Sequence, residues 1–574
     1  MSSRLINLFM WPYQVSYGKQ IQGLVRRVLN ELGATVEAEV LVVGTRSPES
    51  DKYHTICVEP ENDKWDVDIF DGLLVSVEQI YKNHYLQNMI YSDSASMRDK
   101  PEWMRRSSVK SAVSQSIKLF DDANNVTSFC GDTRRLDDYY ITPIIQIPNS
   151  IFLQFPPLPT ISGGKGHRSL LHAAIDAVLD EATQELETPE PGRFNTMRSE
   201  DEIVQIAAKS FMHTAGASIV EQYYTTDLFY SINVVSSLLY EGTKGIGNLI
   251  LSSPESNEIE FVVKFISPVS FGEPRWVRKI LQMASKGIGV IADSRQIYGL
   301  GKLKETHNAD SQNAFIVSFI DHYHWELRCG NLLLLKSHYS KPKLPQEPVN
   351  KSAFLATYHR MFPFAEQKSG MHLWKLVTAQ INQNHGSMMI VAEDAAQEAL
   401  RLNRQGTCIT PTLLSESLLQ SVSGIDGTIL LDPSCFCHAI GIILDGEATD
   451  QCTPSRGARY NSGVRYVRSS SYKRLSIVVS DDHTIDIIPE IRKLVSRSRI
   501  EYHVSCLEMA TIDNYHNSRN WLNEHRFYVN EQQCVRINKA IERLNSLPRE
   551  VGLIYLSTQK FDVHPEMDES YLMD

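Results

Sequence analysis

Short apolar runs that alternate with longer amphipathic stretches recur along most of this chain. LVVG (41–44) and ITPIIQIP (141–148) have the continuous apolar character of buried strands. The stretch from Gln20 to Leu32 has helical spacing with apolar residues on one side, and a second helical pattern covers His172 to Leu186. Because both periodicities occur in one chain, we expect the α/β fold class.

Two polar, proline-containing stretches predict where domains meet. Residues 183–201 and 340–352 hold prolines that stop a helix or a strand. At about 150 residues per domain, a chain of 574 residues has room for three or four domains. We expect an N-terminal α/β region of unknown role (1–182), an α+β domain (202–340), an α/β domain (353–500), and a C-terminal helical extension with an acidic tail (501–574).

Both central domains show patterns of sheets with helices around them. In the α+β domain, a helical pattern at 202–213 precedes strand patterns at 248–253, 259–266, 287–293, 296–303, 313–320 and 332–336. In the α/β domain, helical patterns at 373–384, 395–405 and 412–424 alternate with strand patterns at 387–393, 427–432, 437–446, 475–482 and 484–491. The alternation in the α/β domain predicts a mixed sheet flanked by helices.

One short pattern occurs in both central domains. Gly289 to Gly301 and Ile429 to Gly441 each have the pattern of a strand, an aspartate turn, a second strand and a glycine. An ancient duplication explains this likeness, and so does the general recurrence of hairpins with polar turns. No long internal repeat is visible in the sequence.

The amino-acid composition limits which binding partners and which cellular compartment we expect for this protein. The hydrophobic fraction of 42% is ordinary for a globular protein, and the net charge of -11 does not favour a nucleic-acid polymer as partner. Nine cysteines at irregular spacings favour a reducing compartment. Since neither a secretory signal nor an apolar run of membrane-spanning length is visible, we expect a cytoplasmic protein with no membrane partner.

The candidate chemistry lies in the α/β domain. Asp426-Gly427-Thr428 opens a predicted strand, and Gly457 to Gly463 is a glycine-bounded loop that carries Arg459. A carboxylate beside a glycine is suited to hold a divalent metal or a ribose hydroxyl, and an arginine makes bidentate contacts to phosphate oxygens. Together these residues favour nucleotide chemistry at strand ends, where α/β proteins usually build their sites.

The stretch from about His372 to Glu490 resembles the diadenylate cyclase (DAC) domain. Four motifs occur in the order of that family: His385-Gly386-Ser387 at the start of a strand, Asp426-Gly427-Thr428 for D-G-A, Gly457 to Gly463 for G-T-R-H-R-A-A, and Ser480-Asp481-Asp482 for S-E-E. Residues 277–301 resemble the predicted sensor domains found upstream of some such cyclases. The resemblance implies a DAC-like domain at 353–500, with a mixed sheet flanked by helices, behind a sensor-like domain at 202–340.

The resemblance also implies an activity and its residues. A DAC domain condenses two ATP molecules into cyclic di-AMP with Mg²⁺ or Mn²⁺, and two facing sites imply at least a transient homodimer. By this resemblance Asp426 and Arg459 are catalytic, and Asp426 and Asp481 bind the metal. The residues that it implies bind the nucleotide are Gly427, Thr428, Gly457, Ala458, Tyr460, Asn461, Ser462 and Ser480.

The chain departs from the family at one of these motifs. Where the family has R-H-R, the sequence has Arg459-Tyr460-Asn461, so one guanidinium is replaced by a neutral amide. Two functions therefore stay open. One is a cyclase regulated by the upstream domain, and the other is a nucleotide-binding receptor that has lost catalysis and signals to a partner. A purely structural interaction protein would leave Asp426 and Arg459 unexplained.

Four other features have simpler interpretations. The stretch 162–169 is similar to a phosphate loop but lacks its full motif, so we expect a flexible connection. Cys435, Cys437 and His438 have no second pair at zinc spacing, which predicts core packing. We expect His322 and His324 to share one face of a strand as a half-buried pair, and the acidic C-terminal tail to be solvated.

Overall fold

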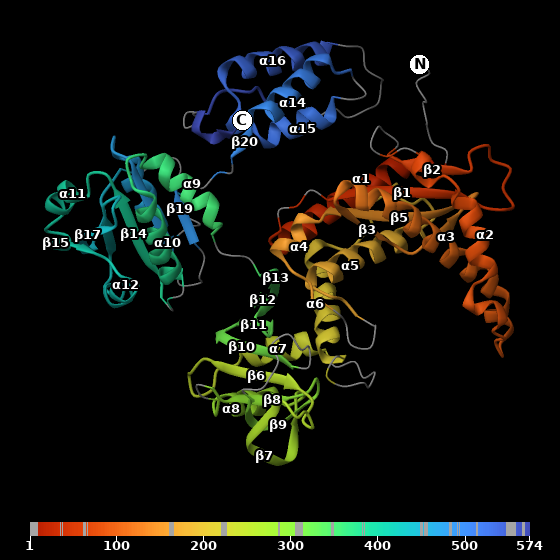
Figure 1. The fold of residues 1–574 in the computed structure, drawn as a ribbon, viewed down its shortest axis with the longest axis horizontal. Helices are drawn as coiled ribbons and strands as arrows, with labels where there is room; N and C mark the ends of the chain where they lie inside the picture. Colours follow the sequence, from red (N-terminus) through yellow and green to blue (C-terminus); the bar gives the residue numbers. More distant parts are fainter. Residues whose placement is uncertain are drawn as a thin grey trace. The chain divides into compact units, whose positions relative to one another are not determined.

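The structure is a computed structural model of the 574-residue chain. It describes residues 10–573 except 35, 37, 61–64, 66, 160–165, 218, 220–226, 285–286, 305–313, 346–348, 382, 384, 448–451, 453–456, 481–484, 491, 493, 512–514, 547–557, 565–566 and 568. The chain separates into two compact units, residues 1–346 and residues 347–574, and each is described by itself (Figure 1). The stretch 162–165 of the phosphate-loop-like segment lies outside the described residues.

The first unit begins with an antiparallel sheet between two helical layers. Its strand order is β2-β1-β5-β3, with β4 paired to β5. The strands are β1 (Glu39–Arg46), β2 (Ile56–Glu59), β3 (Val126–Cys130), β4 (Arg134–Leu136) and β5 (Tyr139–Pro148). Alternate residues of β1 enter two different cores, because Val40 and Val42 face one helical layer and Leu41 and Val43 face the other.

The helices of this region divide between those two cores. α1 (Gln14–Glu31), α5 (Leu170–Glu185) and α6 (Glu200–Ala217) belong to the first core, and α2 (Leu73–Lys82) and α3 (Ser94–Asn124) belong to the second. A short helix, α4 (Ser150–Gln154), follows β5. Both predicted helices are confirmed, with α1 starting earlier than the periodicity indicated. The prediction did not include the long helix α3.

The proline-containing stretch at 183–201 connects α5 to α6 within one continuous core. Trp11 donates a hydrogen bond of 2.8 Å from its Nε1 to the Pro191 carbonyl. The buried Glu185 carboxylate accepts a 3.3 Å bond from the Gly192 N–H and a bond from the Thr196 hydroxyl. The stretch is therefore held against α5 and the segment just before α1 by specific hydrogen bonds.

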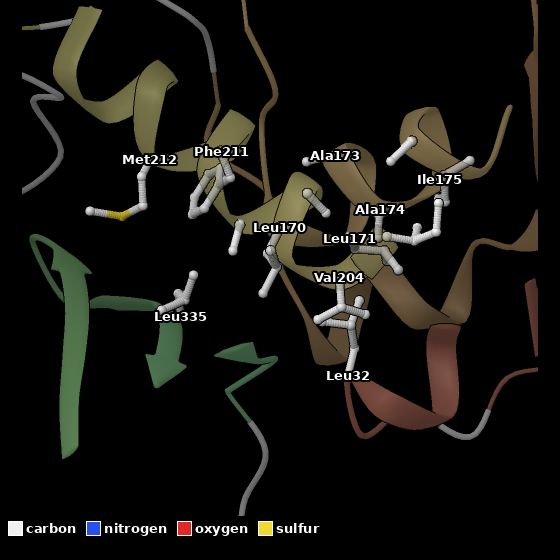
Figure 2. Packing of buried hydrophobic residues seen from close by; sticks show 14 of the residues in the cluster. Leu32, Leu170, Leu171, Ala173, Ala174, Ile175, Val204, Phe211, Met212 and Leu335 are labelled. Carbon is white, nitrogen blue, oxygen red and sulfur yellow. The ribbon is translucent and has the colours of Figure 1, made fainter. Parts of the chain in front are cut away.

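The core of the first unit extends beyond this sheet. Figure 2 shows Leu32 beyond the end of α1, Leu170 and Leu171 of α5, and Phe211 and Met212 of α6 in one cluster. The same cluster contains Leu335 from the second sheet of the unit. α6 thus packs between the two sheets of the unit.

The second sheet of the first unit has eight strands. Their order is β13-β12-β11-β10-β6-β8-β9-β7, in which β6 and β8 are parallel and the other neighbours are antiparallel. The strands are β6 (Gly247–Ser252), β7 (Ile259–Ser270), β8 (Gly289–Ala292), β9 (Gln296–Leu303), β10 (Ala314–Asp321), β11 (His324–Cys329), β12 (Leu332–His338) and β13 (Lys341–Lys343). Helices α7 (Leu228–Ser237) and α8 (Pro274–Leu281) accompany them. The predicted strands of the α+β domain are confirmed.

One prediction for this sheet is wrong. His322 and His324 do not share a strand face, because β10 ends at Asp321 and Tyr323 has a positive φ of 57° in the turn before β11. His322 Nε2 lies 2.8 Å from the Ser237 carbonyl oxygen. The ring of His324 instead contacts that of His338 across the β11–β12 pair, at 5.3 Å between centroids.

The second unit contains a six-stranded mixed sheet, which confirms the predicted fold class. The order is β15-β17-β16-β14-β18-β19, with only β14 and β16 parallel among these pairs. The strands are β14 (Ser387–Ala392), β15 (Thr407–Leu413), β16 (Thr428–Leu431), β17 (Phe436–Ile442), β18 (Arg474–Val479) and β19 (Ile485–Ile488). Its helices are α9 (Lys351–Met361), α10 (Gln367–Ile381), α11 (Ala395–Arg401), α12 (Glu416–Val422) and α13 (Ala458–Arg468). The helix predicted at 412–424 is shorter than expected, since Thr412 and Leu413 pair with β17.

The two mixed sheets share one topology. In chain order, β6 to β11 correspond to β14 to β19, because both sets have the spatial order second-fourth-third-first-fifth-sixth. In both sets the first and third strands are parallel, and every other pair is antiparallel. The likeness seen in the sequence at one hairpin thus extends over six strands.

The shared hairpin is anchored in the same way in both sheets. Asp293 Oδ1 accepts from the N–H groups of Arg295 (2.6 Å) and Gln296 (2.8 Å), and its Oδ2 accepts from the Tyr298 hydroxyl at 2.6 Å. Each carboxylate oxygen therefore fixes part of the turn from β8 to β9.

Asp432 has the same role between β16 and β17. Its Oδ1 accepts from the N–H groups of Ser434 (2.8 Å) and Phe436 (3.0 Å), and its Oδ2 lies 3.0 Å from Nε2 of His438. His438 therefore has a structural partner. The thiols of Cys435 and Cys437 are buried, as the core-packing interpretation predicted.

The C-terminal extension forms a small helical core of its own. Helices α14 (Arg497–Met509), α15 (His516–Glu524) and α16 (Glu531–Ser546) pack around it (Figure 1). The expectation of a solvated tail holds only in part, because Tyr571 is buried in this core while Asp562, Val563 and Glu569 are exposed. The last strand, β21 (Leu572–Met573), pairs in parallel with β20 (Val495–Ser496).

Candidate nucleotide site

Three of the predicted motifs meet at one edge of the six-stranded sheet. Thr428, the first residue of β16, pairs with Met388, and Met388 pairs with Val478 near the end of β18. Asp426 and Gly427 directly precede β16, and Ser480 directly follows β18. The strand pairing therefore places the D-G-T motif, the start of β14 and Ser480 side by side.

The arginine-bearing motif reaches the same edge through helix α13. This helix begins at Ala458 with Gly457 as its N-cap, so the predicted glycine loop is mostly helical. Tyr460 in its first turn packs against a small core that contains Met388 and Val478. The N-terminal end of α13 thus lies at the strand ends that carry the other motifs.

The close approach of α13 to the sheet depends on Gly463. A Cβ atom at this position would lie 2.6 Å from Oγ of Ser476 in β18, a distance that real Cβ contacts essentially never show. Glycine at position 463 therefore sets how near the helix lies to the strands.

The opposite end of α13 is fixed by buried charges. The Arg474 guanidinium donates to the Asp394 carboxylate at 3.2 Å and 2.6 Å, and its NH1 group donates to the Tyr466 carbonyl at 3.1 Å. Glu398 accepts from the Tyr466 hydroxyl at 2.8 Å and lies 3.1 Å from Arg474. These four buried side chains tie α13 to α11 and β18.

This network lines a pocket of about 690 Å³ at the C-terminal end of α13. Its wall includes Arg401. The Arg401 guanidinium donates to the Asp445 carboxylate at 2.6 Å and 2.7 Å, so the two charges compensate each other. In the same wall Arg474 pairs with Glu398. The pocket lies away from the predicted nucleotide residues.

Gly427 has a packing reason to be glycine. Its φ is 118°, and a Cβ there would lie 2.5 Å from the carbonyl carbon of Gly441 in β17. Any side chain would clash with the backbone of the neighbouring strand. The first turn of the site is therefore held tightly against β17.

Thr428 is completely buried at this edge. Among the described residues, its Oγ1 has no hydrogen-bond partner. A buried hydroxyl without a partner costs free energy, so such a group is a candidate for satisfaction by something the chain itself does not supply. Asp426, two positions earlier, is exposed to solvent.

The first turn of α13 brings together backbone N–H groups, an arginine and an asparagine amide. Gly457 has no side chain with which to cap the helix, so the N–H groups of this turn receive no capping bond from that position. Arg459 is partly exposed. Asn461 donates from its side-chain amide to the Gly457 carbonyl at 3.3 Å, so its Nδ2 already serves the helix. The arrangement favours an anion near Arg459.

The structure does not describe every predicted site residue. Gly457, Ala458 and Ser462 lie in or beside the first turns of α13, and Ser480 follows β18. Asp481, the second predicted metal ligand, lies outside the described residues. In the part of the chain that is described, no group of three or more His, Cys, Asp and Glu side chains is arranged to hold a metal ion.

Comparison with known proteins links the first unit to sensor domains. Residues 10–212 match the family model "Probable sensor domain DACNG", and residues 226–331 match "Probable sensor domain DACNH". These are sensor domains of DAC-associated proteins. The sensor-like character predicted for the middle of the chain is thereby supported. The N-terminal region, whose role the sequence leaves open, matches a model of the same class.

Only weak similarities to solved structures accompany these family matches. No curated protein matches the chain. A double mutant of DacA from Staphylococcus aureus is 14% identical with a TM-score of 0.19, covering 21% of this chain and 83% of that one. A hypothetical membrane spanning protein from Bacillus cereus is 20% identical with a TM-score of 0.17, covering 21% of this chain and 59% of that one.

One finding concerns membranes. None of the helices in the described ranges is long and apolar enough to span a bilayer.

Proposed function

We propose that residues 353–500 form a nucleotide-binding DAC-like domain that condenses two ATP molecules into cyclic di-AMP, under the control of the sensor domains upstream. One observation carries the proposal: Asp426-Gly427-Thr428, the arginine-bearing start of α13 and Ser480 lie at one edge of one sheet. These motifs are far apart in the sequence, and the DAC resemblance requires them to act together.

In this proposal the Arg459 guanidinium binds the phosphates of ATP together with the N–H groups in the first turn of α13. Asp426 receives the proton of the ribose 3′-hydroxyl or orients that hydroxyl. The 3′-oxygen of each ATP forms a bond to the α-phosphorus of the other, and the bond from that phosphorus to the β-phosphate oxygen breaks. Two pyrophosphate molecules leave.

A divalent metal fits this edge. Mg²⁺ is usually held by one or two carboxylates and the substrate phosphates, and Asp426 offers one exposed carboxylate. When bound, Mg²⁺ or Mn²⁺ would neutralise charge that develops on the phosphates. We propose the same role for Asp481 from the sequence resemblance.

The test is incubation of the purified protein with ATP and Mn²⁺ or Mg²⁺, with the products separated by mass. We expect cyclic di-AMP from the native protein and at least a hundredfold less from Asp426→Asn and Arg459→Ala, because each loses a group that acts on the transition state. Arg468→Ala is the matched control, since it removes an exposed arginine from the other end of the same helix. Equal loss in the control would contradict a site at the N-terminal end.

A second function is favoured by one contact. Asn461 stands where the family has its second arginine, and its Nδ2 bonds to the Gly457 carbonyl of its own helix. A site with one guanidinium would bind a nucleotide and lack full stabilisation of the transition state. In that case the domain is a receptor. Calorimetry would then detect ATP or cyclic di-AMP binding that Arg459→Ala abolishes, with no product from either protein.

A further inference from the structure

A pocket of about 320 Å³ lies in the first unit, away from the DAC-like domain. It is a pocket open to solvent, and its lining residues come from α6, α7, the turn from β10 to β11 and the turn from β12 to β13. Of its walls, α6 falls within the segment that matches one sensor domain, and α7 and the β10–β11 turn fall within the segment that matches the other. The pocket is therefore formed jointly by the two probable sensor domains.

The sheet beneath this pocket has lost the features of the nucleotide edge. Counted back from the aspartate turn that both hairpins share, the positions of Asp426 and Gly427 are taken by Gly287 and Ile288. A ligand of this domain would therefore be bound by groups other than the carboxylate and glycine of the nucleotide edge. The pocket supplies such groups.

Strained backbone is concentrated at the two turns beside the pocket. Tyr323, Tyr339 and Ser340 have positive φ angles of 57°, 48° and 60°, a region that non-glycine residues seldom adopt. Residues held in this region are strained, and they cluster at functional sites. The rings of Tyr323 and Tyr339 stack at 5.2 Å between centroids, and Tyr323 itself lines the pocket.

Asn233 supplies a buried polar group to the pocket wall. Its Oδ1 accepts from Nε1 of Trp325 at 2.8 Å and from Oγ of Ser337 at 3.0 Å. The indole nitrogen of Trp325 can only donate, so the accepting atom must be the oxygen of the amide. The group that Asn233 has left to offer a ligand is its Nδ2 donor, on a side chain that is 7% exposed.

The pocket wall carries no unbalanced charge among its described residues. Lys209 and Asp227 form an ion pair of 3.1 Å at the wall. Much of the remaining surface is apolar or aromatic, from Phe229, Val234 and Tyr323. An anion would meet a cation that is already neutralised, whereas a flat uncharged ring would contact aromatic and aliphatic side chains.

From these observations we infer that the pocket between α6 and α7 is the ligand site of the sensor region. It binds a small, uncharged, planar heterocycle of nucleobase size that accepts a hydrogen bond from Asn233 Nδ2. The volume lies at the low end of the range for small-molecule sites, which suits a ligand of this size. The Tyr323 ring and the apolar wall contact the faces of the heterocycle.

The full-length protein tests this site by saturation-transfer NMR with three probes of different ring type: adenine, uracil and nicotinamide. We expect transfer to at least one probe. Val234→Trp should abolish it, because the indole fills the pocket. Asn233→Asp should weaken the same binding about tenfold, since it retains the acceptor for Trp325 and Ser337 and removes the donor.

Two controls show whether a loss of binding comes from the filled pocket or from damage to the fold. Val262→Trp is the matched variant, because it makes the same change at an exposed position of β7 and should leave binding unchanged. Thermal unfolding of every variant shows whether the fold is kept. Binding that persists in Val234→Trp but is lost in Arg459→Ala would assign the probe to the nucleotide edge and overturn the inference, as would the absence of transfer to all three probes.

Discussion

At the scale of single residues, Gly427 is fixed by its neighbours before any ligand is considered. The sequence resemblance assigns this glycine to nucleotide binding, but the backbone of Gly441 alone already excludes a side chain there. A residue of a functional motif can therefore be required twice, once by the strand packing and once by the chemistry.

We predict that Gly427→Ala destabilises the second unit by about 2 kcal/mol or more, because it combines a positive φ with a backbone clash. Urea denaturation measures this free energy of unfolding. Gly424→Ala is the matched control: a Cβ there meets nothing within 4 Å, and we expect a change within about 0.5 kcal/mol. Equal stability of the two variants would show that β16 moves away from β17 without cost.

Glu398 allows a prediction for pH. Burial alone disfavours its charged form, but hydrogen bonds from Arg401 and Tyr466 and the charge of Arg474 outweigh this and lower the pKa of Glu398 below its ordinary value. A carboxyl group whose pKa is depressed by folding stabilises the protein above its unfolded pKa, about 4.3 for glutamate, and this contribution is lost as the pH falls through the folded pKa.

We therefore expect Glu398→Gln to lower the free energy of unfolding by about 2 kcal/mol at pH 7, where Arg474 retains Asp394 as partner. The difference from the native protein should shrink as the pH is lowered below about 4.3. Chemical denaturation at several pH values measures it. A difference that stays constant with pH would mean that the charge of Glu398 does not contribute.

At the scale of elements, the structure adds most to the sequence analysis at the β8–β9 and β16–β17 hairpins and at the C-terminal tail. In the aspartate turns of β8–β9 and β16–β17, one carboxylate oxygen accepts from two backbone N–H groups, and the six strands around each turn share one order. The tendency of aspartate to form turns accounts for one hairpin. It does not account for six corresponding strands with the same order and the same parallel and antiparallel pairings. The topology thus favours duplication over chance recurrence of a hairpin.

The C-terminal tail leads to a prediction about Tyr571. Its ring packs edge-on against Phe527 at 4.8 Å, and the Arg360 guanidinium lies 3.8 Å from its centroid. Tyr571→Ala should cost about 3 kcal/mol of stability, whereas Met573→Ala, at a residue that is 48% exposed, should be close to neutral. Thermal unfolding of residues 347–574 measures both. Similar melting temperatures would indicate that the tail does not hold this core together.

At the scale of the whole molecule, the chain divides into two units with separate cores. The first has its main cores between residues 10 and 344, and the second has its cores between residues 349 and 572. We predict that residues 1–346 and 347–574, expressed separately, each unfold cooperatively, and that calorimetry of the full chain reproduces the sum of their transitions. A fragment that shows no cooperative transition would contradict this division.

Much of the secondary structure could be predicted because it depends on local periodicity. The helices α1, α5 and α6 and nearly all predicted strands follow from apolar spacing. The long helix α3 could not be predicted in this way, since serines and charged residues interrupt its apolar positions. The β10–β11 turn was missed because Tyr323 adopts a positive φ without the glycine or asparagine that usually signals one.

The site motifs could be found from the sequence, but their meeting could not. Asp426-Gly427-Thr428 and Arg459 are recognisable from residue type and spacing. That they share an edge depends on the parallel pairing of β14 with β16 and on the packing of α13 over Met388 and Val478. The role of Asn461 within its own helix was likewise invisible before the helix was placed.

The sequence by itself determined the fold class, most strands and the candidate nucleotide residues, because these depend on periodicity and residue chemistry within short windows. Only the tertiary structure decided that two sheets share one topology, that the acidic tail closes a core, and that a pocket lies between α6 and α7. Each of these depends on contacts between residues far apart in the chain. The pairing and packing energies of such contacts are not encoded in any single segment.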